Sequence, residues 1–390
     1  MKNFEIIVAG GGPAGLAAAC LVAQEGRRVA LVGGARPKRD DPRTVALMQP
    51  SIKLLASLGV WPSKLECQVA PLKRLRIVDD TGAVFRAPTI TFDPTEIGEE
   101  VFGWNIPLAL LIPLLQARAI ELGVEIIAAD VTAAQSSDGS IDVVTPEGTL
   151  AAQLALAADG RQSVLREAAG IRCNTWDYEQ TAIATSFDHS GGHDGLSTEY
   201  HRGPGPCTTV PMMGKRSSLV WLERPGRAAE LMAMDEQSLA VEIQIATHGD
   251  LGRVSGIGPR QAFPMHGLTA HQFAAHRTLL IGEAGHVAPP IGGQGLNMAL
   301  RDGADAAALI AGAADAGAVD ILLDYDRLRR RDVWPRQQII DLVNRSLLSG
   351  FAPLETARTV GFELLAGIPP MRRYIMRQGL GSLSASHQAP

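Results

Sequence analysis

The sequence predicts an α/β fold, in which a Rossmann-like nucleotide-binding domain carries an inserted antiparallel β-sheet and ends in C-terminal helices. Three observations support this prediction. A strand, glycine turn, helix and second strand follow one another in the first forty residues. Short β-type segments dominate between residues 176 and 265, separated by Gly, Pro and Ser turns. After a return to Rossmann character near residue 277, the chain reads as helical from residue 296, apart from a polar tail after Gly381 that is expected to be disordered.

These observations divide the chain into two kinds of structure. We expect residues 1–175 and 266–390 to form the nucleotide-binding domain, the second part together with the C-terminal helices. Residues 176–265 would form the antiparallel sheet of a substrate domain, with contributions from about 72–108. A chain of 390 residues is too long for one small core, which suits this arrangement.

Composition limits the classes of function. The chain is 46% hydrophobic and 20% charged, as in ordinary soluble proteins, and its net charge of −5 argues against nucleic acid as a partner. The four cysteines are scattered and are expected to be reduced thiols. The longest apolar stretch, residues 108–115, is far shorter than the about twenty residues of a bilayer span. We therefore expect a cytoplasmic protein, at most attached to a membrane surface.

The first half of the chain alternates strands and helices. Apolar runs predict buried strands at 6–9 and 29–32 around an alanine-rich helix at 14–26. A helix is expected near 51–58, a hairpin turn at 79–82, and a helix at 112–122 before a strand at 124–127. A second hairpin should join strands 141–145 and 150–157.

The second half begins with the inserted sheet. Its strands are expected at 181–187, 198–201, 207–211 and 217–223, followed by a helix near 238–247. The run 277–282 again has the apolar character of a buried Rossmann strand. From residue 296 onward only helical periodicity remains.

The first motif is a GxGxxG turn between the first strand and helix. Gly10 allows the tight turn, Gly12 lets a pyrophosphate approach the backbone, and Gly15 allows the helix to pack on the strand. The acidic residue expected at the end of the second strand to bind ribose hydroxyls is replaced by Gly33. Backbone groups of Gly33 could hold the ribose instead, with Arg36 over the adenine or the phosphates. The alternative is a vestigial fold that has lost its nucleotide.

Two further motifs place a carboxylate after a strand. Asp159 ends one strand and is followed by Gly160 and a helix start, although such a turn alone is common. Glu283 ends the strand near 277–282, and the glycine-rich loop 290–297 follows it. Glu283 could accept hydrogen bonds from ribityl hydroxyls, and the Gly293–Gly295 backbone could approach a flat ring system. His286 is expected to order this loop.

Taken together, the three motifs resemble those of the class A flavin-dependent aromatic hydroxylases, and most closely the ubiquinone-biosynthesis hydroxylases of the UbiH/UbiF type. The resemblance extends over essentially the whole chain. Two positions depart from the family pattern, since Gly33 replaces an acidic residue and Glu283 replaces Asp. The stretches that carry the resemblance are GGGPAG (10–15), DDPRTVAL (40–47), FGWNIP (102–107), ADGRQSVLR (158–166), VPMMGKRSSLVW (210–221), GEAGHVAPPIGGQGLNMALRD (282–302) and NRSLLSGF (344–351).

The resemblance implies an FAD-dependent monooxygenase. NAD(P)H would reduce FAD, and one oxygen atom of O2 would then be transferred to the ring of a polyprenyl phenol in ubiquinone biosynthesis. Arg43 matches a family arginine that contacts the flavin side of the cofactor; the alternative is a surface arginine. The residues expected to bind FAD are Gly10, Gly12, Pro13, Ala14, Gly15, Gly33, Arg36, Arg43, Val131, Asp159, Glu283, Pro290, Gly293, Gln294, Gly295, Leu296 and Asn297.

Substrate contacts are expected from the inserted sheet. An apolar chamber for a prenylated ring could be formed by Thr209, Pro211, Trp221, Phe263 and Met265, although each could equally be a core residue. No metal site is expected, because His189 and His193 stand in a glycine-rich segment without further ligands. His201 could face the substrate cavity; the sequence does not decide it. No catalytic acid or base is assigned.

Arginines and apolar helical periodicity combine in residues 322–378. These helices could simply pack on the nucleotide-binding domain, or they could contact the membrane or a quinone-biosynthesis complex. Two alternatives for the function also stand beside the leading one. The chain could hydroxylate a small soluble aromatic compound, or it could be a non-catalytic scaffold subunit, as the glycine at position 33 would allow.

Overall fold

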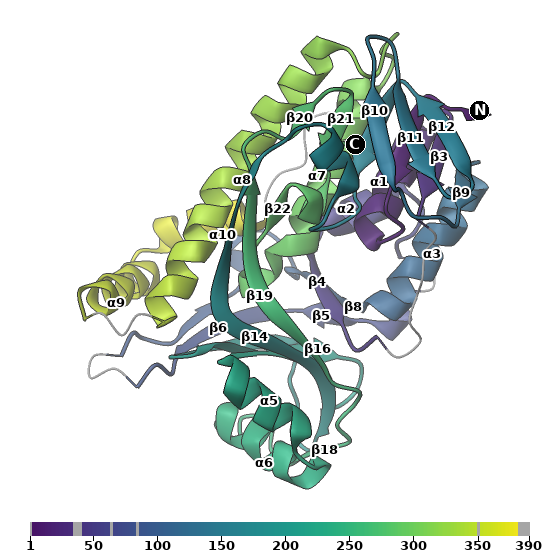
Figure 1. Ribbon diagram of the computed structural model, residues 1–390. Coiled ribbons are helices and arrows are strands. Elements are labelled where there is room, and N and C mark those ends of the chain that lie inside the picture. The colour runs from purple at the N-terminus through teal and green to yellow at the C-terminus, as the bar shows by residue number, and fades with distance from the viewer. Residues whose placement is uncertain (1, 34–40, 63–64, 83–85, 349–351, 381–390) are drawn as a thin grey trace.

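The computed structural model describes residues 2–33, 41–62, 65–82, 86–348 and 352–380. It has the mixed α/β architecture that the sequence predicts. A mostly parallel sheet with helices lies at one end of the molecule, and a large, mostly antiparallel sheet lies at the other (Figure 1). The C-terminal helices run along one side of both.

The parallel sheet is the Rossmann-like part of the fold. Its strand order is β20-β21-β13-β2-β3-β9, and only the edge strand β20 runs antiparallel. All four residues of β2, β3 and β13 are buried, because helices cover the sheet, as continuous apolar runs predict. The strands are β2 Ile6–Ala9, β3 Val29–Val32, β9 Glu125–Ile127, β13 Leu154–Ala157, β20 Ala274–Ala275 and β21 Thr278–Leu280.

Helices α1, α3 and α7 pack together on this sheet. The expected helix and strand order of the first forty residues is confirmed by β2, α1 and β3. The expected helix at 112–122 begins earlier, at Leu108, which directly follows strand β8. The helices are α1 Pro13–Gln24, α2 Gln49–Ser57, α3 Leu108–Glu121, α4 Val164–Ala168 and α7 Gln294–Ile310.

A small sheet of order β1-β12-β11-β10 flanks the parallel one. The hairpin of β11 and β12 is confirmed, but the strand expected at 150–157 is divided at Gln153. The backbone N–H of Gln153 donates to the carbonyl of Glu5, so β12 stays in the small sheet and β13 enters the parallel one. The strands are β1 Lys2–Asn3, β10 Ala133–Ser136, β11 Ile141–Thr145 and β12 Gly148–Ala152.

The large sheet has the order β22-β19-β14-β17-β16-β15-β6-β7, with β18 paired to β14. Strands β14 and β19 are long and curve from this sheet towards the parallel one (Figure 1). The sequence prediction missed β19 and the length of β14. The strands are β6 Arg74–Asp79, β7 Ile90–Phe92, β14 Cys173–His189, β15 Leu196–Arg202, β16 Gly205–Met212, β17 Arg216–Glu223, β18 Val254–Ser255, β19 Gln261–Ala270 and β22 His286–Val287.

The expected hairpin turn at 79–82 is not a tight one. Strands β6 and β7 pair antiparallel, but residues 80–89 connect them. Next to this pair, β4 Thr44–Met48, β8 Gly103–Pro107 and β5 Ala70–Leu72 form a three-stranded sheet between the two larger ones.

The two faces of the large sheet pack against different elements. Helices α5 Pro225–Ala233 and α6 Glu236–Ala246 cover one face, where Tyr200 and Leu219 lie in a core with Ile243. On the opposite face, Val210 and Ile77 pack against a cluster shared with the three-stranded sheet and the C-terminal helices.

The described part of the chain after residue 318 is helical, as expected. It forms α8 Val319–Leu348, α9 Ala352–Gly367 and α10 Pro369–Leu380. The described ranges also contain four short 3₁₀ turns: η1 Glu66–Gln68, η2 Pro94–Ile97, η3 Gly282–Ala284 and η4 Ile291–Gly293. Among the helices of the described ranges, none is long and apolar enough to cross a bilayer.

Candidate functional site

The glycine turn between β2 and α1 is shaped to bind a phosphate. Gly10 has φ +115°, and a Cβ there would lie 2.0 Å from the carbonyl oxygen of Ala158. A Cβ on Gly15 would lie 1.9 Å from the carbonyl oxygen of Gly10. Gly12 differs, because among the described residues a Cβ would meet no atom within 4 Å, and no described side chain caps the helix that it precedes. The first backbone amides of α1, including those of Ala14 and Gly15, therefore face open space. A pyrophosphate needs such accessible amides to bind.

Gly33 ends β3 beside this turn, where an acidic residue was expected. Its φ is +103°, a region that L side chains rarely adopt, and its N–H donates to the carbonyl of Ile127 at 3.0 Å. A Cβ would lie 3.2 Å from the nitrogen of Gly11. The local backbone therefore explains why glycine stands here. Arg36 lies outside the described residues, and Val131 is half-buried against the core of the parallel sheet.

Asp159 follows β13 at the same edge of the sheet. Its Oδ2 accepts hydrogen bonds from the backbone N–H groups of Val164 and Leu165, at 2.9 and 3.3 Å. Its Oδ1 is buried and has no partner in the part of the chain that the structure describes. Arg166, in the following helix, donates to the carbonyl of Ala284 at 2.9 Å and so ties this loop to the third motif. The orphaned oxygen is an acceptor suited to a hydroxyl of a bound ligand.

Glu283 and Arg43 connect the strand ends with the large sheet. Glu283 is exposed in η3, directly after β21, and interacts electrostatically with Arg43. Arg43 forms an ion pair with Asp41 at 2.6 Å, and its guanidinium lies 5.7 Å from the ring centroid of Phe263. The hydrogen bond with Asp41 raises the pKa of Arg43 above its usual value, so the guanidinium remains cationic. A positive charge therefore stands between the cofactor motifs and the sheet.

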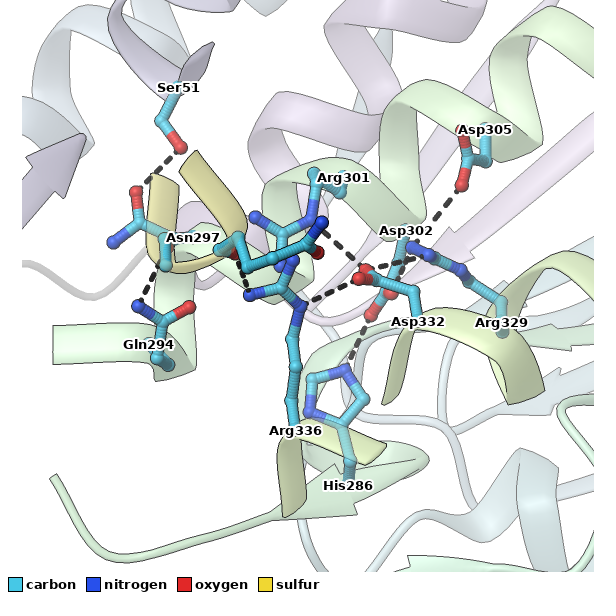
Figure 2. A network of polar contacts seen from close by, with 12 residues as sticks. Ser51, His286, Gln294, Asn297, Arg301, Asp302, Asp305, Arg329, Asp332 and Arg336 are labelled. Atoms are coloured by element: carbon cyan, nitrogen blue, oxygen red, sulfur yellow. Dashed lines mark hydrogen bonds and ion pairs between the residues drawn. The ribbon is translucent and has the colours of Figure 1, made fainter. Parts of the chain in front are cut away.

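The glycine-rich loop at 290–297 leads into α7 and is held in place by one buried side chain. Gly292 and Gly293 both have φ +63°. The Oδ1 of Asn297 accepts from the N–H of Met48 and the hydroxyl of Ser51, at 2.9 and 2.7 Å. Its Nδ2 donates to the carbonyls of Ala46 and Gly293, at 2.8 and 2.7 Å. Figure 2 shows the bond between Asn297 and Ser51. The side chain of Asn297 is thus fully used by the protein, and it would position the loop rather than contact a cofactor.

The other residues of this loop offer backbone and amide groups. Pro290 is exposed, and Gly295 and Leu296 lie in the first turn of α7, which no side chain caps. The Nε2 of Gln294 donates to the carbonyl of Gly379 in α10 at 3.1 Å, whereas its Oε1 is buried without a partner among the described residues. The amides that begin α7 can stabilise negative charge on a bound ring system.

A buried network of charged groups lies behind this loop (Figure 2). Asp302 of α7 accepts from His286 at 2.7 Å, from the N–H of Gly282 at 2.8 Å, and from Arg329 of α8 at 3.0 Å. Burial alone would raise the pKa of Asp302, but His286 and Arg329 outweigh burial and lower that pKa below its usual value. His286 therefore fixes the segment after Glu283, as the sequence suggested.

The five expected substrate residues do not share one face of the large sheet. Phe263 lies beside Arg43, and Met265 is half-buried farther along β19. Trp221 instead lies in the core under α5 and α6, and Thr209, whose register partner Leu219 belongs to that core, points to the same side. Pro211, two residues farther along β16, follows the same alternation. Trp221 and Thr209 therefore face away from the flavin side of the sheet, and the alternate residues Val210 and Ser218 take that face.

Asn105 is a residue of this region that the sequence prediction missed. Its Nδ2 donates to the carbonyl of Pro211 and to the hydroxyl of Ser218, at 2.9 and 3.2 Å. The hydroxyl of Thr44 also bonds that of Ser218 at 2.9 Å. The side chain of Asn105 is 1% exposed and joins the three-stranded sheet to the large one. Its position inside the stretch FGWNIP was the available signal.

His189 and His193 use their ring nitrogens within the protein. His189 bonds the carbonyl of Gly191 and the hydroxyl of Ser217, at 3.0 and 3.1 Å. His193 bonds the carbonyl of Met212 at 2.8 Å and accepts from the N–H of Gly195. These contacts order the end of β14 and its loop.

Comparison with known proteins agrees with this geometry. The model of the FAD binding domain family matches residues 3–338. The ubiquinone hydroxylase UbiL of Rhodospirillum rubrum is 31% identical over 399 residues, covering 100% of this chain and 92% of the relative. The 3-demethoxyubiquinol 3-hydroxylase of Escherichia coli is 26% identical, covering 97% and 98%. The solved structure of p-nitrophenol 4-monooxygenase from Pseudomonas putida aligns with TM-score 0.77 at 19% identity, covering 98% of this chain and 99% of that one; it supports the fold alone.

Proposed function

This chain belongs to the ubiquinone hydroxylase family of FAD-binding proteins, and we propose that it uses FAD, NAD(P)H and O2 to hydroxylate the aromatic ring of a polyprenyl phenol in ubiquinone biosynthesis. The observation that carries the proposal is the meeting of three strand-end loops at one edge of the parallel sheet. These are the loops at Gly10–Gly15, at Asp159 and at Glu283. A single glycine turn would suit many nucleotides, whereas the three together suit an extended dinucleotide.

The residues present fit FAD. The open space at Gly12 and the uncapped start of α1 would receive the pyrophosphate. The orphaned Oδ1 of Asp159 and the exposed carboxylate of Glu283 would accept hydrogen bonds from ribityl hydroxyls. The uncapped start of α7 and Arg43 would lie at the ring end. Bound FAD would supply electron transfer from NAD(P)H and the activation of O2, while these residues bind and orient it.

The substrate would bind between the loop at 290–297 and the flavin side of the large sheet. Phe263, Met265 and Val210 offer apolar surface there, and Arg43 stands at its edge. An apolar wall suits a prenylated ring better than a free carboxylate, because burying an unpaired charge is costly.

Purified protein tests the proposal directly. We expect a yellow preparation with a flavin absorption spectrum, in which a short-chain prenyl phenol accelerates NAD(P)H oxidation and gains one ring hydroxyl group. A small soluble hydroxybenzoate should accelerate it much less. Colourless protein that takes up no added FAD would favour the scaffold alternative and overturn the proposal. Deletion of the gene should also cause a prenylated phenol precursor to accumulate.

We further propose that the protein contacts the membrane peripherally through α9 and α10. The outer sides of these helices expose large apolar residues, whereas Phe362 and Met376 point into the core. Arg373 and Arg377 are exposed beside them and complement anionic lipid headgroups. The exposed apolar residues are Val360, Leu364, Ile368, Met371, Tyr374 and Ile375.

Vesicle flotation tests this contact. The protein should float with vesicles that contain phosphatidylglycerol, and the double variant L364E/I375E should not. The variant I245E, on the exposed side of α6 where Ile245 is 62% accessible, serves as the matched control and should float like the wild type. Equal flotation of all three proteins would contradict the assignment of α9 and α10.

A further inference from the structure

Strand β15 turns a pair of titratable side chains towards the flavin loop. Tyr200 lies in the core under α5 and α6, so its neighbours Glu199 and His201 point to the opposite face. On that face, the N–H of Gly292 donates to Oε2 of Glu199 at 3.4 Å. Glu199 is therefore linked to the same loop that would lie beside the flavin ring.

His201 and Glu199 form a buried dyad. The Nε2 of His201 lies 2.6 Å from Oε1 of Glu199, and the two side chains are 2% and 12% exposed. The Nδ1 of His201 is buried and has no partner among the residues that the structure describes. With its proton on Nε2 donated to Glu199, the imidazole presents an unused lone pair at Nδ1. An unpaired buried acceptor of this kind is costly unless a ligand supplies the donor.

The residues packed around the Glu199–His201 dyad include Phe362, Asp79 and Arg358. Phe362 of α9 packs against His201, with ring centroids 5.9 Å apart. The register partner of His201 on β6 is Asp79, whose carboxylate already accepts from Thr81 and from the N–H of Ala87. Arg358 of α9 lies 3.6 Å from Asp79. The carboxylate of Asp79 is thus satisfied by its own neighbours, whereas Nδ1 of His201 has no partner among the described residues.

We propose that His201 is the catalytic base that deprotonates the phenol of the substrate, and that Glu199 is the residue that positions it. The assignment rests on the proposed hydroxylation of a phenol. The place of the dyad fits, because it lies between the flavin loop at Gly292 and α9, the helix whose outer side is exposed and apolar.

The proton transfer balances within the dyad. The phenolic O–H bond breaks, its proton binds Nδ1 of His201, and the electron pair stays on the ring oxygen. The phenoxide is richer in electrons than the phenol and accepts an electrophilic oxygen atom more readily. Glu199 stabilises the imidazolium through the Nε2 hydrogen bond. After the ring has gained the new hydroxyl group, the original ring oxygen is a carbonyl; the ring carbon that bears the new oxygen releases its hydrogen to solvent as a proton, and His201 returns its own proton to the carbonyl oxygen, so that aromaticity is restored and the histidine ends neutral.

The pH dependence of the H201Q variant tests this role. Gln retains a polar side chain but cannot accept the proton. At pH 7 we expect kcat to fall about 10²-fold or more, the usual contribution of a general base. The loss should shrink as the pH approaches about 10, where a phenol ionises without help. The kcat of E199Q should fall less than that of H201Q. H189Q, which changes a buried histidine on the other face, is the matched control and should keep the wild-type pH profile.

A binding measurement separates this role from mere support of the fold. The probe is 2-prenyl-4-nitrophenol, whose phenolate absorbs visible light, added to the FAD-loaded protein and followed by difference spectroscopy. Wild type should bind it as phenolate below the pKa of the free probe, and H201Q should bind it as neutral phenol. Wild type that binds neutral phenol throughout overturns the proposal even if H201Q does not fold. H201Q with an unchanged pH profile also overturns it, whereas loss of flavin from the wild type would instead defeat the proposed function.

Discussion

Replacing Gly12 with Ala should strongly weaken FAD binding without harming the fold. Gly12 has φ −75° and ψ 173°, an ordinary extended conformation, and a Cβ there meets no atom within 4 Å. The methyl group therefore causes neither strain nor a clash in the unliganded protein. Gly→Ala at a compatible conformation stabilises a protein by about 0.4–1 kcal/mol, because it restricts the unfolded chain. The free energy of unfolding of the apoprotein should thus stay equal or rise slightly.

The same methyl group would stand where the pyrophosphate must approach the start of α1. Keeping the phosphate away from two amides of that turn loses two charge-assisted hydrogen bonds, each of about 1.5–3 kcal/mol. The sum of about 3–6 kcal/mol corresponds to a loss of roughly 10²–10⁴-fold in affinity. G226A in α5, also without neighbours around the added Cβ, is the matched control and should bind FAD normally.

The assay combines two measurements on the apoprotein. Quenching of FAD fluorescence gives the dissociation constant, and thermal unfolding gives the stability. G10A provides the contrast, because its Cβ would meet the Ala158 carbonyl at 2.0 Å and both binding and stability should fall. FAD affinity of G12A within threefold of the wild type, at unchanged stability, would refute the placement of the pyrophosphate.

Three further predictions follow from buried groups. N297A should lower the free energy of unfolding by on the order of 3–5 kcal/mol in urea titrations, because the backbone groups of Met48 and Ala46 in β4 and of Gly293 in η4 lose their partners; a loss below about 1 kcal/mol would contradict this. The lowered pKa of Asp302 contributes stability that is complete above the unfolded value of about 3.9 and is lost as the pH falls through the folded value. In urea titrations between pH 3 and 7, the free energy of unfolding should therefore fall towards acid pH, and it should fall less in D302N than in the wild type. The same fall in both proteins would contradict the role given to the Asp302 network. Burial raises the pKa of Cys207 to about 12, so iodoacetamide should modify the exposed Cys67 in the native protein and spare Cys207 until unfolding; equally fast labelling of both would refute this burial.

The strand-end motifs could be found in the sequence because each depends on local chemistry. A buried apolar run, glycines at Gly10 and Gly15, and a following alanine-rich helix fix a strand, turn and helix without any distant contact. The same applies to Asp159 and Glu283, which follow the buried strands β13 and β21 as the sequence predicts. Their meeting at one edge followed because parallel strands share their carboxyl ends.

What the sequence could not provide was the orientation of strands and the partners of side chains. Trp221 and Val210 belong to alternating positions of one sheet, and a period of two does not reveal which face meets the cofactor. Asn297 looked like a cofactor contact, but its four hydrogen bonds reach residues about 250 positions earlier and within its own loop. Glu199 gave no signal, since its link to Gly292 exists only in the folded chain.

The central claim is that this protein, with FAD bound, transfers one oxygen atom from O2 to the ring of a prenylated phenol. The most direct measurement is turnover of the FAD-loaded protein with NAD(P)H, a short-chain prenyl phenol and ¹⁸O-labelled O2, followed by mass spectrometry of the product. The account predicts a product with one additional ring hydroxyl group, which carries one labelled oxygen. NAD(P)H consumption that yields only hydrogen peroxide, or a product whose new oxygen comes from water, would contradict it.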